Sequence, residues 1–106
     1  MNLYEFQLPD KSNNGLLDYR AAREEFVHCA ADMAGGSSYR GQISGHWIDE
    51  TDALVSEPMH VLHVSCDDKT ASELRALFFD LFPDQKALFC AVIGEAQVFA
   101  REKAAA

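Results

Sequence analysis

Residues 39–66 read YRGQISGHWIDETDALVSEPMHVLHVSC, and this stretch decides the fold. It holds two runs in which apolar and polar side chains alternate, 39–49 and 58–66, separated by a short acidic loop. Alternation with a period of two is typical of strands that bury one face. Two consecutive strands with no helix between them predict an antiparallel hairpin in the middle of the chain.

A strand and a helix pattern flank this hairpin on each side. Residues 3–8 alternate and 16–34 have helical spacing, whereas 71–82 are again helical and 87–99 read as a last, apolar strand. The resulting βαββαβ order resembles the ferredoxin-like α+β plan. That resemblance implies a four-stranded antiparallel sheet, in the order 4-1-3-2, with two helices on one face. We expect a single domain over 1–106, with its core at about 3–99 and a frayed C-terminal tail.

Local signals mark the ends of the two helices. Residues 12–15 (SNNG) predict a turn with side chains that cap the first helix, and Gly35 predicts its left-handed C-terminal cap. Thr70 and Glu73 have the spacing of a capping box at the second helix, which Pro83 should end. Gly41 and Gly45, inside the first hairpin strand, indicate a bulge or the close approach of a neighbouring backbone.

The helix and strand periods also predict the core between the helices and the sheet. Ten residues share this inward position: Tyr4, Phe6, Phe26, Cys29, Leu62, Val64, Leu74, Leu77, Phe78 and Leu81. The three cysteines, Cys29, Cys66 and Cys90, follow no regular spacing and lie among apolar neighbours. We therefore expect three unpaired core thiols.

Charge and hydropathy exclude several classes of protein. The chain has 9 basic and 17 acidic residues in 106, a net charge of −8, and 48% hydrophobic residues. A field of this sign repels nucleic acid and anionic membranes, so neither is an expected partner. No apolar run reaches the roughly 18 to 20 residues that span a bilayer, and no signal peptide is evident, which predicts a cytoplasmic location.

The sheet face without helices, called the free face below, is the surface of interest. The expected register places Glu5, Gln7, His63, Ser65, Arg40, Gln42, Ser44 and His46 on it, beside one apolar row of the last strand. An apolar row on an otherwise polar face predicts a covering partner, and a second copy of the chain is the simplest one. We therefore expect a homodimer that associates through its sheet.

The histidines are the candidates for acid–base chemistry. His60 and His63 are three residues apart and should point to opposite faces of their strand. His46 and His63 should converge on the free face, but no third metal ligand accompanies them. The stretch 41–45 (GQISG) is not a nucleophile motif, because its serine is one position late. The sequence thus predicts no metal, no cofactor and no catalytic residue.

Two classes of function remain open. The first is a small acidic non-enzymatic interaction or regulatory module that binds another protein, one with a basic surface. Its contact residues would be Trp47, Asp49, Glu50, Asp52 and Glu57. The alternative is a small enzyme similar to the dimeric α/β-barrel monooxygenases, with His63 and His46 as catalytic candidates, or a small-ligand sensor with a pocket on the free face.

Overall fold

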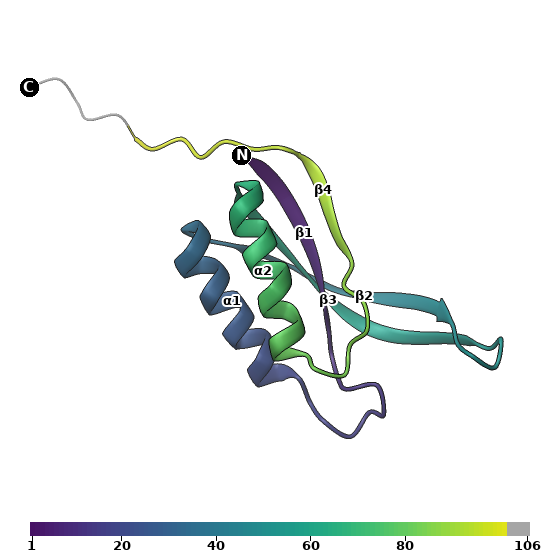
Figure 1. Cartoon of the computed structure of the whole chain (residues 1–106). Helices are drawn as coiled ribbons and strands as arrows, with labels where there is room; N and C mark the ends of the chain where they lie inside the picture. The colour runs from purple at the N-terminus through teal and green to yellow at the C-terminus, as the bar shows by residue number, and fades with distance from the viewer. Residues whose placement is uncertain (102–106) are drawn as a thin grey trace, which may run out of the picture.

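The computed structural model describes residues 1–101 and contains four strands and two helices. In chain order these are β1 (Asn2–Pro9), α1 (Arg20–Ala34), β2 (Ser38–Ile48), β3 (Leu54–Cys66), α2 (Asp68–Leu81) and β4 (Cys90–Glu95). The strands form one antiparallel sheet in the order β2-β3-β1-β4, and both helices lie on the same side of it (Figure 1). The ferredoxin-like βαββαβ fold predicted from the sequence is confirmed. The frayed tail expected at 102–106 lies outside the described residues.

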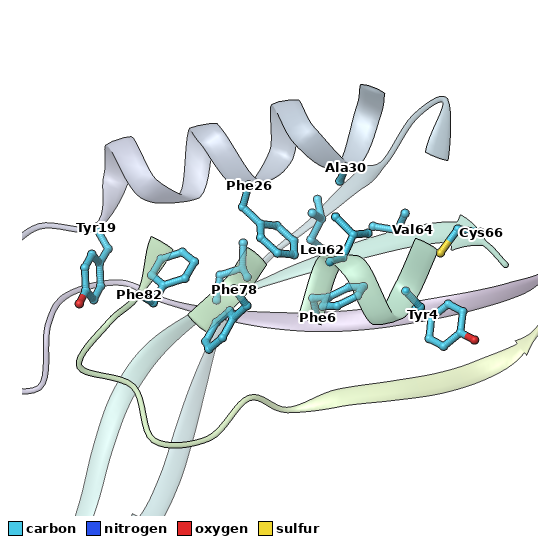
Figure 2. Packing of buried hydrophobic residues seen from close by; sticks show 13 residues of the cluster. Tyr4, Phe6, Tyr19, Phe26, Ala30, Leu62, Val64, Cys66, Phe78 and Phe82 are labelled. Carbon is cyan, nitrogen blue, oxygen red and sulfur yellow. The ribbon is translucent and has the colours of Figure 1, made fainter. Parts of the chain in front are cut away.

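The hydrophobic core fills the space between the helices and the sheet (Figure 2). Seven of the ten predicted core residues are buried, and Leu77 and Leu81 pack partly buried against the cluster. The prediction that Cys29 belongs to the core is wrong, because Cys29 is half-exposed and its Sγ lies 3.5 Å from a Glu25 carboxylate oxygen. Tyr19 and Phe82, whose rings meet edge to face with centroids 5.0 Å apart, close the core at one end.

The cysteines occupy three different environments. All three are free thiols; Cys66 is buried, and Cys90 is half-buried against the core. Burial raises the pKa of the Cys66 thiol, which keeps this sulfur in its unreactive neutral form.

The helix starts differ from the prediction, whereas the helix ends agree with it. Residues 12–15 form a turn, but α1 begins only after Tyr19, which makes no side-chain cap. The N-cap of α2 is Asp67, whose carboxylate accepts a hydrogen bond from the Thr70 amide at 2.8 Å, so Thr70 is not itself the cap. Asp67 is the stronger cap because its side chain is charged and lies at the positive end of the helix. Gly35, at φ +83°, ends α1 as predicted.

A β-bulge in β2 reverses the two faces of this strand relative to the expected register. Tyr39 pairs with Leu62 and Gly41 with Val61, so Arg40 is an extra residue. Gly41 accommodates the distortion at φ +103°, a conformation that favours glycine. A Cβ on Gly45 would lie 3.0 Å from the Met59 side chain. The bulge expected of these glycines is therefore present, whereas the close neighbour of Gly45 is a side chain and not the backbone that was expected, whose nearest atom would be 3.7 Å away.

The reversal changes what the free face carries. Beyond the bulge, Gln42, Ser44 and His46 lie on the helix side of the sheet, so their predicted place on the free face is wrong. Ile43 and Trp47 lie on the free face instead. One extra residue moves every later side chain of the strand to the opposite face, because the side-chain period is two.

The β2–β3 hairpin extends well beyond the two helices (Figure 1). The radius of gyration is 16.0 Å and the principal extents are 67 × 25 × 23 Å. A compact chain of this length has a radius of gyration of about 13 Å. The molecule is therefore elongated, with the β2–β3 hairpin extending at one end and the chain after β4 at the other (Figure 1). The base of the hairpin contacts the loop after β1, since Trp47 and Glu57 line one pocket with Asp10 and Asn13.

Candidate functional site

The two histidines singled out from the sequence lie apart. His63 is on the free face, where its Nε2 is 2.9 Å from Glu5 Oε1, and Gln7 Nε2 donates to the other Glu5 oxygen at 3.1 Å. The hydrogen bond with His63 lowers the pKa of the Glu5 carboxyl. His46 is exposed near the end of the hairpin and pairs with Ser56, on the helix side of the sheet. The expected convergence of His46 and His63 is wrong for two reasons. The hairpin register pairs His46 with Ser56, seven residues along β3 from His63, and the bulge at Arg40 also turns His46 to the opposite face.

The hairpin tip, residues 48–54, carries three of the predicted acidic contacts. Asp49 acts inside the turn, because its Oδ1 accepts hydrogen bonds from the Thr51 amide, the Thr51 hydroxyl and the Ala53 amide at 2.6–3.0 Å. These bonds, chiefly the one from the Thr51 hydroxyl, lower the pKa of Asp49. Glu50 and Asp52 are exposed, and Asp52 has φ +63°. Only the latter two carboxylates are free to meet a partner.

Glu57 and Trp47 lie further down the hairpin, on the free face. Glu57 pairs with Gly45 and Trp47 with Val55. Partial burial raises the pKa of Glu57, and the negative charge of Asp84 raises it further. Glu57 is thus influenced by the loop after α2 and is separate from the acidic tip.

A hydrogen-bonded cluster that the sequence did not reveal lies where β1 ends, on the helix side of the sheet. His60 connects two neighbours, with Nε2 2.8 Å from Asp10 Oδ1 and Nδ1 2.8 Å from the Tyr39 hydroxyl. Arg23 of α1 donates from Nη1 to the carbonyl oxygens of Pro9 and Asp10, at 3.1 and 2.7 Å, and this Nη1 is 3.8 Å from Asp10 Oδ1. The cluster therefore joins β1, β2, β3 and α1.

The cluster has defined electrostatics. The hydrogen bond with His60 is the main cause that lowers the pKa of Asp10, and the positive charge of Arg23 adds to the effect. An ionised Asp10 accepts from His60 Nε2–H, which leaves Nδ1 either as an acceptor for the Tyr39 hydroxyl or, when the ring is protonated, as a donor to it. A proton taken up by His60 thus changes which hydrogen bonds Tyr39 can make.

A cavity of about 550 Å³ opens beside this cluster, between α1 and the sheet. Its apolar lining includes Leu8, Val27 and Leu62, and its polar lining includes Arg20, Tyr39 and His60. This volume lies within the range of small-molecule sites, about 300–1,000 Å³.

Only the position of His60 in this cluster could be predicted from the sequence. The alternation of β3 correctly places His60 on the helix side, where a histidine among apolar neighbours needs a polar partner. Finding Asp10 requires the β1–β3 register, in which Leu8 pairs with His60, and finding Tyr39 requires the position of the bulge.

Within residues 1–101, no three or more His, Cys, Asp or Glu side chains are grouped so that they could hold a metal ion. The two helices of this part of the chain are also too short and too polar to cross a membrane.

Comparison with known proteins identifies the fold. No family model and no curated protein matches the sequence. The chain is similar in structure to the periplasmic divalent cation tolerance protein CutA from Archaeoglobus fulgidus, with a TM-score of 0.62 and 10% identity over 92% of this chain and 86% of that one. The divalent cation tolerance protein Cut A1 from Thermus thermophilus gives a TM-score of 0.65 and 10% identity over 91% and 86%. CutA from Synechococcus elongatus gives a TM-score of 0.61 and 11% identity over 89% of this chain and 77% of that one. The chain therefore has a CutA-like, ferredoxin-type α+β fold.

Proposed function

We propose that this protein is a small non-enzymatic interaction module that forms a homodimer through the free face of its sheet. The observation that carries the proposal is the set of large apolar side chains on this face. Ile43, Trp47 and Phe89 are 40%, 41% and 53% exposed. The β2–β3 register shows that the side chains of Ile43 and Trp47 lie on the free face. Phe89 lies on the same face because its carbonyl accepts a hydrogen bond from the amide of Gln7, a residue of that face. Neither helix lies over this face (Figure 1).

The composition of the face fits a second copy of the chain. Its centre holds the Glu5–His63 pair, in which both side chains are largely buried although no helix covers them. Apolar residues around a paired polar group are typical of an interface that a two-fold axis makes self-complementary. The elongated hairpin adds area, and a stable dimer needs upwards of roughly 1,000 Å² in total.

Net charge predicts the salt dependence of this association. Two chains of charge −8 repel each other, and added salt screens that repulsion. Dimerisation through an apolar face should therefore strengthen as the salt concentration rises, whereas binding to a basic partner should weaken.

Trp47, the only tryptophan of the chain, allows a direct test. If the free face is covered in the dimer, Trp47 emission should be blue-shifted at about 100 µM protein and should move to longer wavelength on dilution towards about 0.1 µM. Higher salt should strengthen the dimer, so the midpoint of this emission shift should move to lower protein concentration. Emission that is independent of concentration would contradict the proposal that this face is the interface.

We further propose that the hairpin tip, through Glu50 and Asp52, contacts a second protein that has a basic surface, while Trp47 belongs to the dimer face. The support is the exposure of Glu50 and Asp52 at the end of an arm that extends from the body. Attraction between this tip and a basic partner raises the association rate and is screened by salt.

The test is binding of a lysine-rich peptide, followed by Trp47 fluorescence, to a Glu50→Gln/Asp52→Asn double variant. Asp49 is left intact because it holds the turn, and asparagine tolerates the positive φ of Asp52. We expect the double variant to bind at least about fivefold more weakly at low salt. A Glu24→Gln/Asp32→Asn variant removes two exposed charges from α1 and should bind like the wild type. Equal weakening in both variants would show that net charge alone matters.

A further inference from the structure

The cavity between α1 and the sheet combines an apolar floor with a cationic rim. Leu8 and Leu62 are buried core residues, and Val27 of α1 lies partly buried beside them. Arg20 and Arg23, two of the nine basic residues of an acidic chain, line the same cavity. A ligand that matches both parts has an apolar body and one negative charge.

The two arginines have different freedom to bind. Arg23 is held by the Pro9 and Asp10 carbonyl oxygens and acts as a fixed positive charge. The Arg20 guanidinium is hydrogen-bonded to Glu24 alone within residues 1–101, at 3.2 Å, and both of these side chains are well exposed. Exposed ion pairs of this kind contribute little stability, so Arg20 can exchange Glu24 for a ligand at small cost. A guanidinium group matches the planar carboxylate with two parallel hydrogen bonds.

Tyr39 and His60 supply a second donor that depends on protonation. When His60 is neutral, with Nε2–H donated to Asp10, its Nδ1 accepts the Tyr39 hydroxyl proton. When His60 is protonated, Nδ1–H donates to the Tyr39 oxygen, and the hydroxyl proton is free to point into the cavity. The charged and titratable groups around His60 are Asp10, Lys11, Arg20, Arg23, Glu24 and Tyr39.

We propose that this cavity binds a small organic monocarboxylate and takes up a proton on His60 as it does so. The apolar body of the ligand packs on Leu8, Val27 and Leu62. The carboxylate accepts hydrogen bonds from Arg20 and from the Tyr39 hydroxyl. The single free guanidinium, with Glu24 beside it, favours one negative charge over the two of a phosphate group. This site is on the helix side of the sheet and is independent of the proposed dimer face.

The test uses phenylacetate as the probe and nuclear magnetic resonance of the labelled wild-type protein as the readout. Phenylacetate should shift the amide signals of Leu8, Val27 and Leu62 with a saturable curve at about pH 6. Two controls each lack one element: phenylacetamide has no charge, and acetate has no apolar body. Each should bind at least about tenfold more weakly, since each loses one of the two recognition elements.

The pH dependence and three variants test the role of the cluster. Affinity for phenylacetate, measured over a series of pH values, should be lower wherever His60 is neutral, because the neutral ring accepts the Tyr39 hydroxyl proton at Nδ1 and withdraws it from the cavity. Arg20→Gln should weaken binding at every pH, and Tyr39→Phe should remove the pH dependence. His63→Gln is the matched control, because His63 also pairs with a carboxylate but on the opposite face, and it should leave binding unchanged.

Three results would overturn the proposal. These are equal affinity for phenylacetate and phenylacetamide, absence of saturable shifts around the cavity, and an unaltered pH dependence in Tyr39→Phe. Tyr39 is 60% exposed, so loss of its hydroxyl leaves the core intact and the variant can be interpreted. Retained dimerisation in the same samples would separate a failure of this site from a failure of the dimer interface.

Discussion

Truncation of Phe78 to alanine is expected to lower the free energy of unfolding by about 3 to 5 kcal/mol. Phe78 is 1% exposed and lies on the inner side of α2, with its ring centroid 4.8 Å from that of Phe82 (Figure 2). The substitution removes an aromatic ring from a packed layer that cannot fully collapse around the space. Urea denaturation at one fixed protein concentration measures the loss, since dimerisation makes stability depend on concentration.

The neighbouring residue provides the control for this prediction. Phe79 is on the same helix but is 43% exposed, and Phe79→Ala removes the same group with the same change in helix propensity. We expect it to cost less than about 1 kcal/mol, since surface substitutions rarely cost more. A similarly small loss for Phe78→Ala would contradict the position of the core between α2 and the sheet.

Ile43→Lys is expected to weaken self-association by at least about a hundredfold, because each copy would bring an unpaired charge into the apolar interface. The added lysine reduces the net negative charge and hence the general repulsion between chains. Any loss of association must therefore come from the free face itself. Ultracentrifugation of the variant and the wild type over the same concentration range measures the difference.

Leu16→Lys adds the same charge away from the sheet. Leu16 is 87% exposed in the loop before α1, so this variant should associate as well as the wild type or slightly better. Unchanged association of Ile43→Lys would remove the free face as the interface.

The order of the elements could be predicted because it depends only on local periodicity. Alternation in 58–66 and helical spacing in 71–82 required no knowledge of the rest of the chain, and both appear in the structure. The register of β2 could not be predicted to one residue. Gly41 indicated a bulge, but glycine permits a bulge without requiring one, and the position of the extra residue decides the face of His46 and Trp47.

The candidate sites were harder to predict because they depend on pairing between distant strands. The Asp10–His60–Tyr39 cluster joins residues up to 50 positions apart, and each pair depends on a different strand register. Asp49 illustrates the opposite case, in which a carboxylate that looks free in the sequence is used by the backbone of its own turn. Counting acidic residues cannot separate such a structural side chain from Glu50, which is exposed beside it.

The molar mass of the wild-type chain in solution, measured by light scattering across micromolar concentrations, tests the central claim most directly. One chain has a mass of 11.8 kDa, so the homodimer through the free face predicts about twice that value at high concentration and moderate salt. The mass should decrease towards that of one chain on dilution, at the same concentrations at which Trp47 emission shifts. A constant mass of 11.8 kDa over the whole range, or a higher multiple of it, would contradict the homodimer.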